Sequence, residues 1–175
     1  ELIGAIPEEI GNLTNLTLLE FSSNDLTGEI PSSIGNLIEL DEFYAYDNQL
    51  SGEIPSSIGN LTNLSILNLK DNELSGQIPS SIGNLTNLSY LQLNDNQLSG
   101  LVPESICNLN LWNFSSWPWP NLSNNNLCPS YPECTLFFIG EQDISECSFG
   151  CTDSTACNYN SDAISDDGSC LQNDC

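Results

Sequence analysis

The amino-acid sequence predicts an α/β solenoid that ends in a small disulfide-rich module. Two observations support this prediction: a block of similar sequence recurs every 24 residues, and the eight cysteines all lie in the last 69 residues. A fixed period of this length is typical of stacked coils, because one coil alone cannot bury its apolar side chains. We therefore expect a solenoid over residues 1–147 and a separate module over residues 148–175.

Three units recur in each block. A leucine-rich unit, such as Leu64, Leu67 and Leu69, alternates apolar and polar residues and predicts a short strand with inward leucines. An asparagine follows it, and its inward amide can bond the backbone where the chain leaves the strand; the equivalents are Asn24, Asn48, Asn72 and Asn96. A Gly-x-Ile-Pro unit comes next. An Ile-Gly-Asn-Leu unit completes the block at 10–13, 34–37, 58–61 and 82–85, with a degenerate copy at 106–109.

The order of these units resembles the plant-type leucine-rich repeat, whose pattern is LxxLxxLxLxxNxLSGxIPxxIGNL. The resemblance covers about residues 1–135. It implies a plant-type leucine-rich repeat solenoid with short parallel strands on a concave face. It also implies that ligands bind through that face.

The last coil departs from the repeat pattern, and we expect a modified coil with a cysteine cap over about residues 104–147. The segment 112–120 holds all three tryptophans. It is interpreted either as an apolar lid that closes the solenoid end or as a docking or sugar-binding platform. Residues 126–134 are similar to the cysteine-bearing C-terminal caps of secreted leucine-rich repeat proteins. This resemblance implies a four-cysteine cap formed by Cys128 and Cys134 of this segment together with Cys107 and Cys147.

The cysteines predict disulfides rather than a zinc site, because no CxxC…CxxC spacing occurs and an even number is typical of an oxidising compartment. The second set is Cys151, Cys157, Cys170 and Cys175. If each set pairs internally, three connectivities remain open for each. Residues 151–170 resemble a CTDxxACNYN…DDGSC module of surface and secreted proteins from marine microbes and large aquatic viruses. This implies an exported or particle-surface protein and names no activity.

Composition excludes several function classes. The chain has 24 acidic residues, one basic residue (Lys70) and no histidine, for a formal net charge of −23. Histidine-based catalysis and histidine metal sites are excluded, and so is a nucleic-acid partner, because phosphate binding needs clustered Lys and Arg. No apolar run approaches the roughly 20 residues that cross a bilayer, so no membrane insertion is expected. The sequence starts at Glu1 with no methionine or signal peptide, which predicts a processed chain or a fragment.

A candidate ligand site lies at the exposed strand positions that form the concave face of a leucine-rich repeat. Rows across the strands place Tyr44 beside Asn68 and Gln92, and Glu42 in the neighbouring row. Aromatic rings with amides and carboxylates suit a protein or glycan ligand, and an ordinary solvated sheet face is the alternative. The candidates are Glu42, Tyr44, Tyr46, Asn68, Lys70, Tyr90, Gln92 and Trp119.

Two groups of carboxylates are candidate cation sites. Asp47, Asp71 and Asp95 form a column at 24-residue spacing. Two interpretations are open: each aspartate caps its own turn, or the column binds calcium or sodium weakly. The C-terminal module is rich in oxygen ligands, but its sequence departs from the EF-hand pattern. It is interpreted either as a looser calcium site or as an acidic loop held by disulfides. Its candidate ligands are Asp153, Asp162, Asp166 and Asp167. No other cofactor is expected.

Several Asn-x-Ser/Thr sequons are candidate glycosylation sites. In each block the first asparagine persists where the sequon fails, as at Asn36, which favours a structural role for it. The second asparagine is replaced by Glu39 in one copy and is therefore expected to be exposed. The candidate acceptors are Asn15, Asn63, Asn87, Asn113 and Asn121.

The sequence as a whole predicts a non-catalytic, extracellular binding module for recognition or adhesion at a cell, virion or fibre surface. No pair of carboxylates is singled out for acid and base roles, and serine or cysteine nucleophiles lack a histidine partner. The first alternative is a subunit that assembles head-to-tail into an extracellular filament, because an uncapped coil exposes an apolar edge. Ice binding ranks below both, since no strict Thr-x-Thr array appears. The expected partners are thus proteins, glycans or copies of the chain itself.

Overall fold

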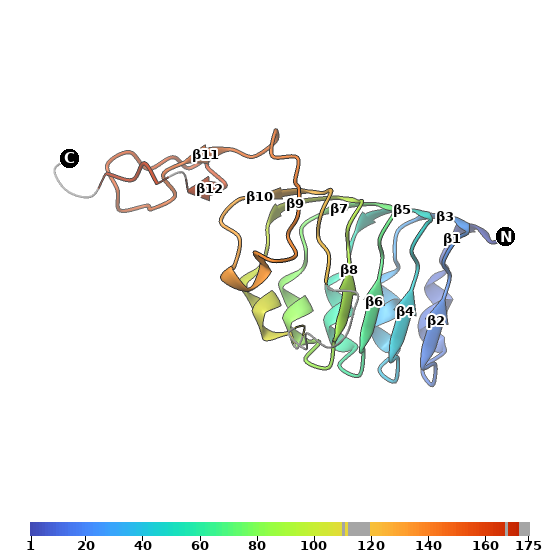
Figure 1. Ribbon diagram of the computed structural model, residues 1–175. Helices are drawn as coiled ribbons and strands as arrows, with labels where there is room; N and C mark the ends of the chain where they lie inside the picture. The colour runs from blue at the N-terminus through green and yellow to red at the C-terminus, as the bar shows by residue number, and fades with distance from the viewer. Residues whose placement is uncertain (110, 112–119, 167, 172–175) are drawn as a thin grey trace.

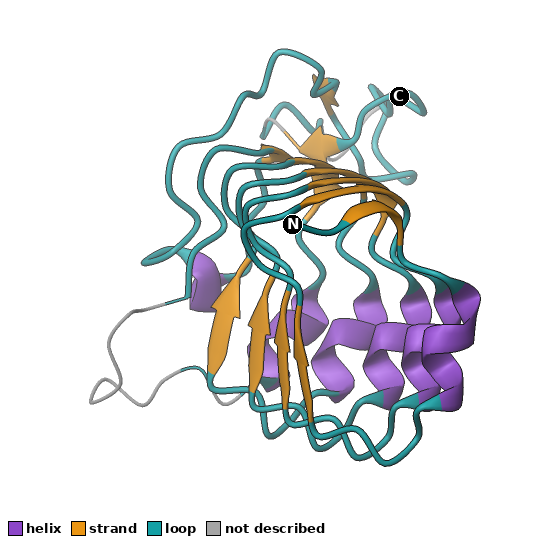
Figure 2. Cartoon of the chain, turned by 90° about the vertical axis from the view of Figure 1, so that its right-hand side faces the viewer, coloured by secondary structure: helices purple, strands orange, loops and turns teal. Residues whose placement is uncertain are grey.

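The computed structural model describes residues 1–109, 111, 120–166 and 168–171, and these form a stack of coils followed by a smaller C-terminal segment (Figure 1). Each coil contributes strands to two different sheets and one short 3₁₀ helix (Figure 2). The strands and helices thus repeat with the sequence blocks, and the predicted solenoid is confirmed.

The first sheet, called here the inner sheet, is formed by the leucine-rich units. Its strands are parallel and lie in sequence order: β2 (Leu18–Glu20), β4 (Glu42–Tyr44), β6 (Ile66–Asn68) and β8 (Tyr90–Gln92). Leu67 pairs with Phe43 on one side and Leu91 on the other, so each residue lies beside its equivalent 24 positions away. A bridge from Gln92 to Asn121 continues the ladder into the modified coil.

The second sheet, called here the flank sheet, lies on another side of the coils. Its six parallel strands are β1 (Ile3–Ala5), β3 (Asp25–Gly28), β5 (Gln49–Glu53), β7 (Glu73–Gly76), β9 (Gln97–Leu101) and β10 (Asn126–Cys128). Here Thr27 pairs with Gln49 and Ser51 with Glu73, an offset of two residues from the 24-residue repeat. Equivalent positions are therefore staggered by roughly 6.6 Å along the strands from one coil to the next.

The third side of each coil is a 3₁₀ helix: η1 (Glu8–Asn12), η2 (Ser32–Asn36), η3 (Ser56–Asn60), η4 (Ser80–Asn84) and η5 (Glu104–Asn108). Each begins directly after the proline of the Gly-x-Ile-Pro unit, whose φ is fixed near the helical value. Pro55 has φ −64°, and its carbonyl accepts a hydrogen bond from the Ile58 N–H at 2.9 Å. The proline therefore starts the helix, two or three residues after the flank strand has ended.

The core is a continuous column of stacked aliphatic side chains with a ladder of buried amides at its edge. Leu64, Leu67 and Leu88 are completely buried. Asn72 Oδ1 accepts a hydrogen bond from the Leu50 N–H at 3.0 Å, and its Nδ2 donates to the carbonyls of Ala45 and Leu69. Such bonds satisfy backbone groups that would otherwise be orphaned in the core. The predicted amide ladder is confirmed.

Glycine and serine set the close spacing of the 3₁₀ helices. A Cβ placed on Gly59 would lie 2.5 Å from the carbonyl oxygen and 2.6 Å from the Cβ of Ser81, so only glycine fits there. Ser81 Oγ in turn donates to the Ser56 carbonyl at 2.6 Å. At the position equivalent to Gly59 in the fifth copy stands Cys107, whose side chain instead forms a disulfide with Cys134 in η6 (Glu133–Thr135).

Beyond the repeats, the chain folds over the last coil as a cap. Cys107 bonds to Cys134 and Cys128 to Cys147, which selects one of the three pairings left open for this set. Residues 138–143 run beside the modified coil: the Leu122 N–H donates to the Phe138 carbonyl, and the Asp143 N–H donates to the Asn125 carbonyl. The four cap cysteines therefore pair among themselves.

The C-terminal segment, residues 148–171, projects from the cap (Figure 1). It contains two paired two-residue strands, β11 (Phe149–Gly150) and β12 (Ser165–Asp166), and the disulfide Cys151–Cys170. Cys157 is also disulfide-bonded, and Cys175 lies outside the described residues. Ser165 Oγ donates to the Pro129 carbonyl at 2.9 Å and ties the segment to the cap. None of the helices in the described residues is long and apolar enough to span a membrane.

Candidate binding face

The outward side of the inner sheet collects the sequence-predicted candidates into two adjoining rows. Glu42, Ile66 and Tyr90 are cross-strand neighbours in one row. Tyr44 begins the next row, beside Asn68 and Gln92. These rows are as expected from the repeat, because a 24-residue register places equivalent residues side by side. Trp119 lies outside the described residues, and so do the other residues from 112 to 118 of the tryptophan-rich segment.

Tyr44 and Glu42 form a hydrogen-bonded pair on this face. The Tyr44 hydroxyl donates to Glu42 Oε2 at 2.9 Å. Burial, followed by the bond to Glu42 and the negative charge of that carboxylate, raises the pKa of Tyr44 to about 12. The phenol therefore remains neutral and acts as a fixed hydrogen-bond donor beside a carboxylate.

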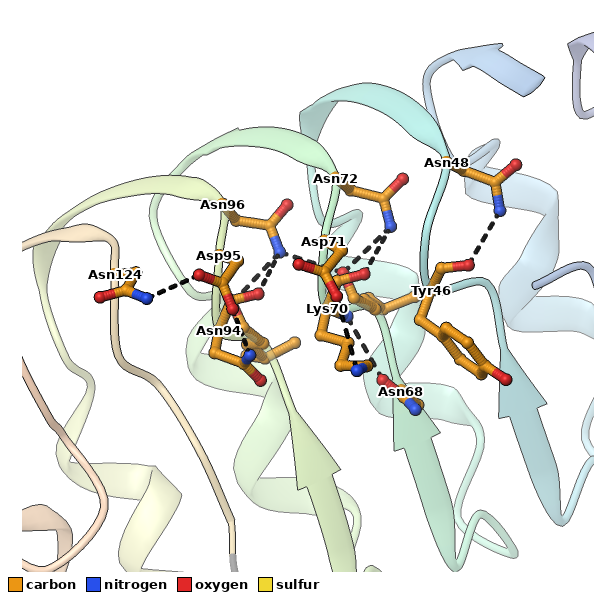
Figure 3. A network of polar contacts seen from close by, with 12 residues as sticks. Tyr46, Asn48, Asn68, Lys70, Asp71, Asn72, Asn94, Asp95, Asn96 and Asn124 are labelled. Carbon is orange, nitrogen blue, oxygen red and sulfur yellow. Dashed lines mark hydrogen bonds and ion pairs between the residues drawn. The ribbon is translucent and has the colours of Figure 1, made fainter. Parts of the chain in front are cut away.

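The chain's single basic residue, Lys70, lies beside Tyr46 and Asp71. Lys70 Nζ is 5.4 Å from the centroid of the Tyr46 ring and 3.5 Å from Asp71 Oδ2 (Figure 3). Burial raises the pKa of Tyr90, whereas the nearby Lys70 charge lowers it and Tyr46 raises it. Tyr44, Tyr46, Lys70 and Tyr90, together with Glu42, thus form one polar aromatic cluster, called here the tyrosine–lysine cluster.

Three amide residues on this face are buried, so the expectation that they are exposed is wrong. Asn68, Gln92 and Asn94 are 4%, 6% and 8% exposed. Asn68 is a short side chain in the row beside Tyr44, and its Oδ1 accepts a 3.4 Å hydrogen bond from the Lys70 N–H. These amides therefore lie below the accessible surface of the face.

The predicted aspartate column lies where the chain leaves the inner sheet. Asp47, Asp71 and Asp95 have φ of 58°, 53° and 55°, a left-handed conformation that aspartate tolerates in turns. Asp71 pairs with Lys70, and Asp95 accepts hydrogen bonds from the amides of Asn94 and Asn124 (Figure 3). These contacts favour the interpretation that the aspartates stabilise their turns over the interpretation that they bind a cation. In the described part of the chain, no three acidic or cysteine side chains form a metal-binding group.

The carboxylates of the C-terminal segment also cap turns. Asp153 Oδ1 accepts hydrogen bonds from the Thr155 N–H and hydroxyl at 2.8 and 2.6 Å. Asp166 Oδ1 accepts from the Gly168 N–H at 2.9 Å, and Asp162 is exposed. Asp167 lies outside the described residues. Calcium binding by these residues stays a prediction.

Exposure does not separate the two asparagines of each sequon pair. Asn15, Asn63 and Asn87 are exposed as expected, but the first members of the pairs, such as Asn60, are exposed as well. Asn63 Nδ2 donates to the Ile38 carbonyl at 3.0 Å, so the second asparagine also has a structural bond. Asn121 is half-buried, and Asn113 lies outside the described residues. Glycosylation stays a prediction.

A feature that sequence reasoning missed lies on another side of the coils. The Gly-x-Ile-Pro units, for which the sequence predicts no site, line two adjoining cavities between the flank sheet and the 3₁₀ helices. The signal that could have revealed them is the repeated glutamate of this unit, at Glu29 and Glu53, directly before an Ile-Pro pair.

Comparison with known proteins agrees with this architecture. The family model described as Leucine Rich Repeat matches residues 15–37, 39–61, 63–85 and 87–109. The chain belongs to the leucine-rich repeat family. No curated protein sequence matches it.

Several solved structures are similar to this leucine-rich repeat chain. The ectodomain of the Arabidopsis thaliana receptor kinase GASSHO1/SCHENGEN3, in complex with CASPARIAN STRIP INTEGRITY FACTOR 2, is 45% identical with a TM-score of 0.66, over 71% of this chain and 14% of that one. The Arabidopsis receptor kinase HAESA, in complex with the peptide hormone IDA and the co-receptor SERK1, is 41% identical with a TM-score of 0.70, over 76% and 21%. A plant ice-binding protein is 36% identical with a TM-score of 0.63, over 72% and 39%.

The present leucine-rich repeat chain thus spans a small part of the length of each receptor ectodomain that it resembles. The repeats account for the whole family match, which ends at residue 109. The resemblance of the C-terminal segment to a module of exported microbial and viral proteins therefore stays a prediction.

Proposed function

We propose that this chain is a non-catalytic, extracellular binding module that holds an extended peptide segment of a protein ligand on its inner sheet. The tyrosine–lysine cluster is the observation that carries the proposal. Tyrosine presents an apolar ring with a polar tip, and tyrosines contribute strongly at the centres of protein interfaces. Tyr44, Tyr46 and Tyr90 are half-buried, so their rings are held in place while part of each surface remains available.

The similar receptor structures support a peptide as the ligand. HAESA is complexed with a peptide hormone, and another similar structure is the plant peptide hormone receptor RGFR1 in complex with RGF2. RGFR1 is 41% identical to this chain with a TM-score of 0.65, over 71% of this chain and 19% of that one. Disulfides within the cap support an extracellular location, because they persist in oxidising compartments.

Electrostatics narrows the chemistry of the ligand. The inner sheet carries Glu20 and Glu42, and the turns after it carry Asp47 and Asp71, whereas Lys70 is its single basic side chain. The face is therefore negative overall, and it favours a peptide with neutral polar or basic side chains over an acidic one.

The test is selection of peptides from a random display library on the full wild-type chain, followed by affinity measurement with variants. We expect Tyr46→Ala and Tyr90→Ala each to raise the dissociation constant at least about tenfold, or ~1.4 kcal/mol. Tyr159→Ala, in the C-terminal segment, is the matched control, because Tyr159 is exposed and lies outside the inner sheet. Selected peptides that bind all variants equally would refute the inner sheet as the site. Binding to a glycan array, without binding to any peptide, would show that the ligand is a glycan and would refute the proposed peptide ligand.

Ice binding is a second candidate, favoured by the similar plant ice-binding protein. The hydroxyl positions of the flank sheet, such as Ser51 and Ser75, repeat in every coil but are staggered between strands. Thermal hysteresis of a solution of the chain decides this candidate. The filament predicted from the sequence would cover the exposed Leu13 and Leu18 of the first coil, and sedimentation over a range of concentrations tests it.

A further inference from the structure

A groove runs along the coils on a face separate from the inner sheet, between the flank sheet and the 3₁₀ helices. It consists of two cavities, of about 620 and 470 Å³, and Glu53 lines both. Its lining residues lie at the ends of the flank strands, on the loops that follow and at the starts of the 3₁₀ helices. The Gly-x-Ile-Pro units at 28–31, 52–55 and 76–79 give the groove a repeated Ile-Pro floor along the stack. It is called here the flank groove.

The floor of the flank groove is apolar and offers few backbone groups. Ile30, Ile54 and Ile78 are 2–3% exposed and close the floor against the core. The prolines beside them have no N–H, and the carbonyls of Pro31 and Pro55 already accept hydrogen bonds within the 3₁₀ helices. A ligand in this groove is therefore recognised through its side chains.

A row of carboxylates is fixed along the rim. A Cβ placed on Gly52 would lie 2.7 Å from Glu29 Cγ, and one on Gly76 would lie 2.8 Å from Glu53 Cγ. Each glutamate side chain thus lies across the glycine of the next coil, which places one carboxylate in each of two successive coils. The chain's only basic residue, Lys70, is paired with Asp71 at the inner sheet, so no basic side chain of the chain neutralises this row.

The charge of the rim changes along the groove. Glu8, Glu29 and Glu53 line the cavity at the N-terminal end. Past Glu53, the equivalent positions are Gln77, which lies across Gly100 in the same way, and Leu101, which is 40% exposed. One half of the flank groove is therefore acidic and the other half is neutral to apolar.

We propose that the flank groove binds an extended basic segment of a partner protein, with Lys or Arg over Glu29 and Glu53 and apolar residues over Gln77 and Leu101. Lys and Arg suit this site because their apolar stems can lie on the Ile-Pro floor while their charged heads reach the rim. A second copy of this chain, with its net charge of −23, and a nucleic acid are both repelled. A shared metal ion is not favoured either, since the described carboxylates form no group of three.

The experiment uses the full chain and fluorescein-labelled peptides of about ten residues, which extend over about 31 Å in a polyproline II conformation. In each peptide, lysine alternates with proline in one half and valine with proline in the other, and both chain directions are tested. Fluorescence polarisation measures the affinity. We expect saturable binding of at least one direction, which weakens as the salt concentration is raised.

Matched variants locate the binding. The double variant Glu29→Gln and Glu53→Gln keeps the shape of the rim, as the native Gln77 shows, and should weaken binding at least about tenfold. The control double variant, Glu39→Gln and Glu141→Gln, removes the same charge at exposed positions that do not line the groove and should leave the affinity unchanged. Gln77→Glu extends the acidic row and should strengthen binding of a peptide whose lysines reach further along the groove.

Three results would overturn the proposal. They are the absence of saturable binding, an equal loss in both double variants, which indicates diffuse attraction to an acidic chain, and loss of binding in Tyr46→Ala. The last result would place the basic peptide on the inner sheet. Because the groove variants leave the tyrosine–lysine cluster intact, failure here does not bear on the proposed function of that face.

Discussion

The repeats and the C-terminal segment of this chain are stabilised in opposite ways. In the repeats, aliphatic side chains such as Leu67 are completely buried, and side chains bond backbone groups 22–27 residues away. In the C-terminal segment, apolar side chains such as Ile164 and Leu171 are 43% and 61% exposed. Its carboxylates instead bond groups two residues away, as Asp153 does to Thr155 and Asp166 does to Gly168. Stacking therefore supplies the repeats with a core that a short segment cannot build.

This difference shows what fixes residue identity in each region. A repeat residue is constrained by the neighbouring coil, as Gly59 is by Ser81. A residue of the C-terminal segment is constrained by its own turn and by disulfides, because fewer than about 40 residues rarely bury enough apolar surface to fold alone. Substitutions should consequently have large, cooperative effects in the repeats and local effects in the C-terminal segment.

The largest expected effect is the loss of a central leucine. Leu67→Ala leaves a cavity in a fully buried position, and we expect it to lower the free energy of unfolding by about 2–5 kcal/mol. Ile164→Ala, at a half-exposed position of the C-terminal segment, should change it by no more than about 0.5 kcal/mol. Urea unfolding followed by circular dichroism measures both. Similar costs for the two variants would contradict the contrast drawn between the regions.

The next largest effect is expected from removing a disulfide of the C-terminal segment, which should destabilise that segment while the repeats remain folded. Replacing Cys151 and Cys170 together by serine removes a cross-link between residues 19 positions apart, which is worth about 3 kcal/mol to the segment. Hydrogen exchange should then accelerate at the amides of Asn160 and Ile164, which donate to the carbonyls of Cys151 and Ser148. The urea midpoint of the repeats should stay unchanged. A parallel fall of that midpoint would show that the segment supports the stack.

Much of the solenoid could be predicted because every coil repeats the same constraints. The alternation of Leu67 and Leu69 predicts the inner strand, and the recurring Asn72 predicts the amide ladder; both are confirmed. The sequence also marks where the stack ends. A Cβ on Gly83 would lie 2.6 Å from the Cβ of Ser105, so Cys107 in the equivalent position signals that no further serine packs there.

The remaining features depend on contacts between coils that a period alone does not specify. The pairing of Cys128 with Cys147 follows from how the cap folds over the last coil, and three pairings were equally open in the sequence. The burial of Asn68, at an outward position of an inner strand, does not follow from the alternation of the strand. The flank groove requires both the stacking of the coils and the extension of Glu29 across Gly52.

The smallest expected effect concerns Tyr44 and appears only at high pH. Its pKa is raised from 10.0 to about 12, first by burial and then by the bond to Glu42. Because the folded state favours the neutral phenol, its contribution to stability is fully present below pH 10 and is lost as the pH rises toward 12. Between these values the wild-type chain should lose more stability than Tyr44→Phe, which cannot ionise. Equal alkaline losses in urea titrations of the two proteins would show that the Tyr44 phenol is not held neutral beside Glu42.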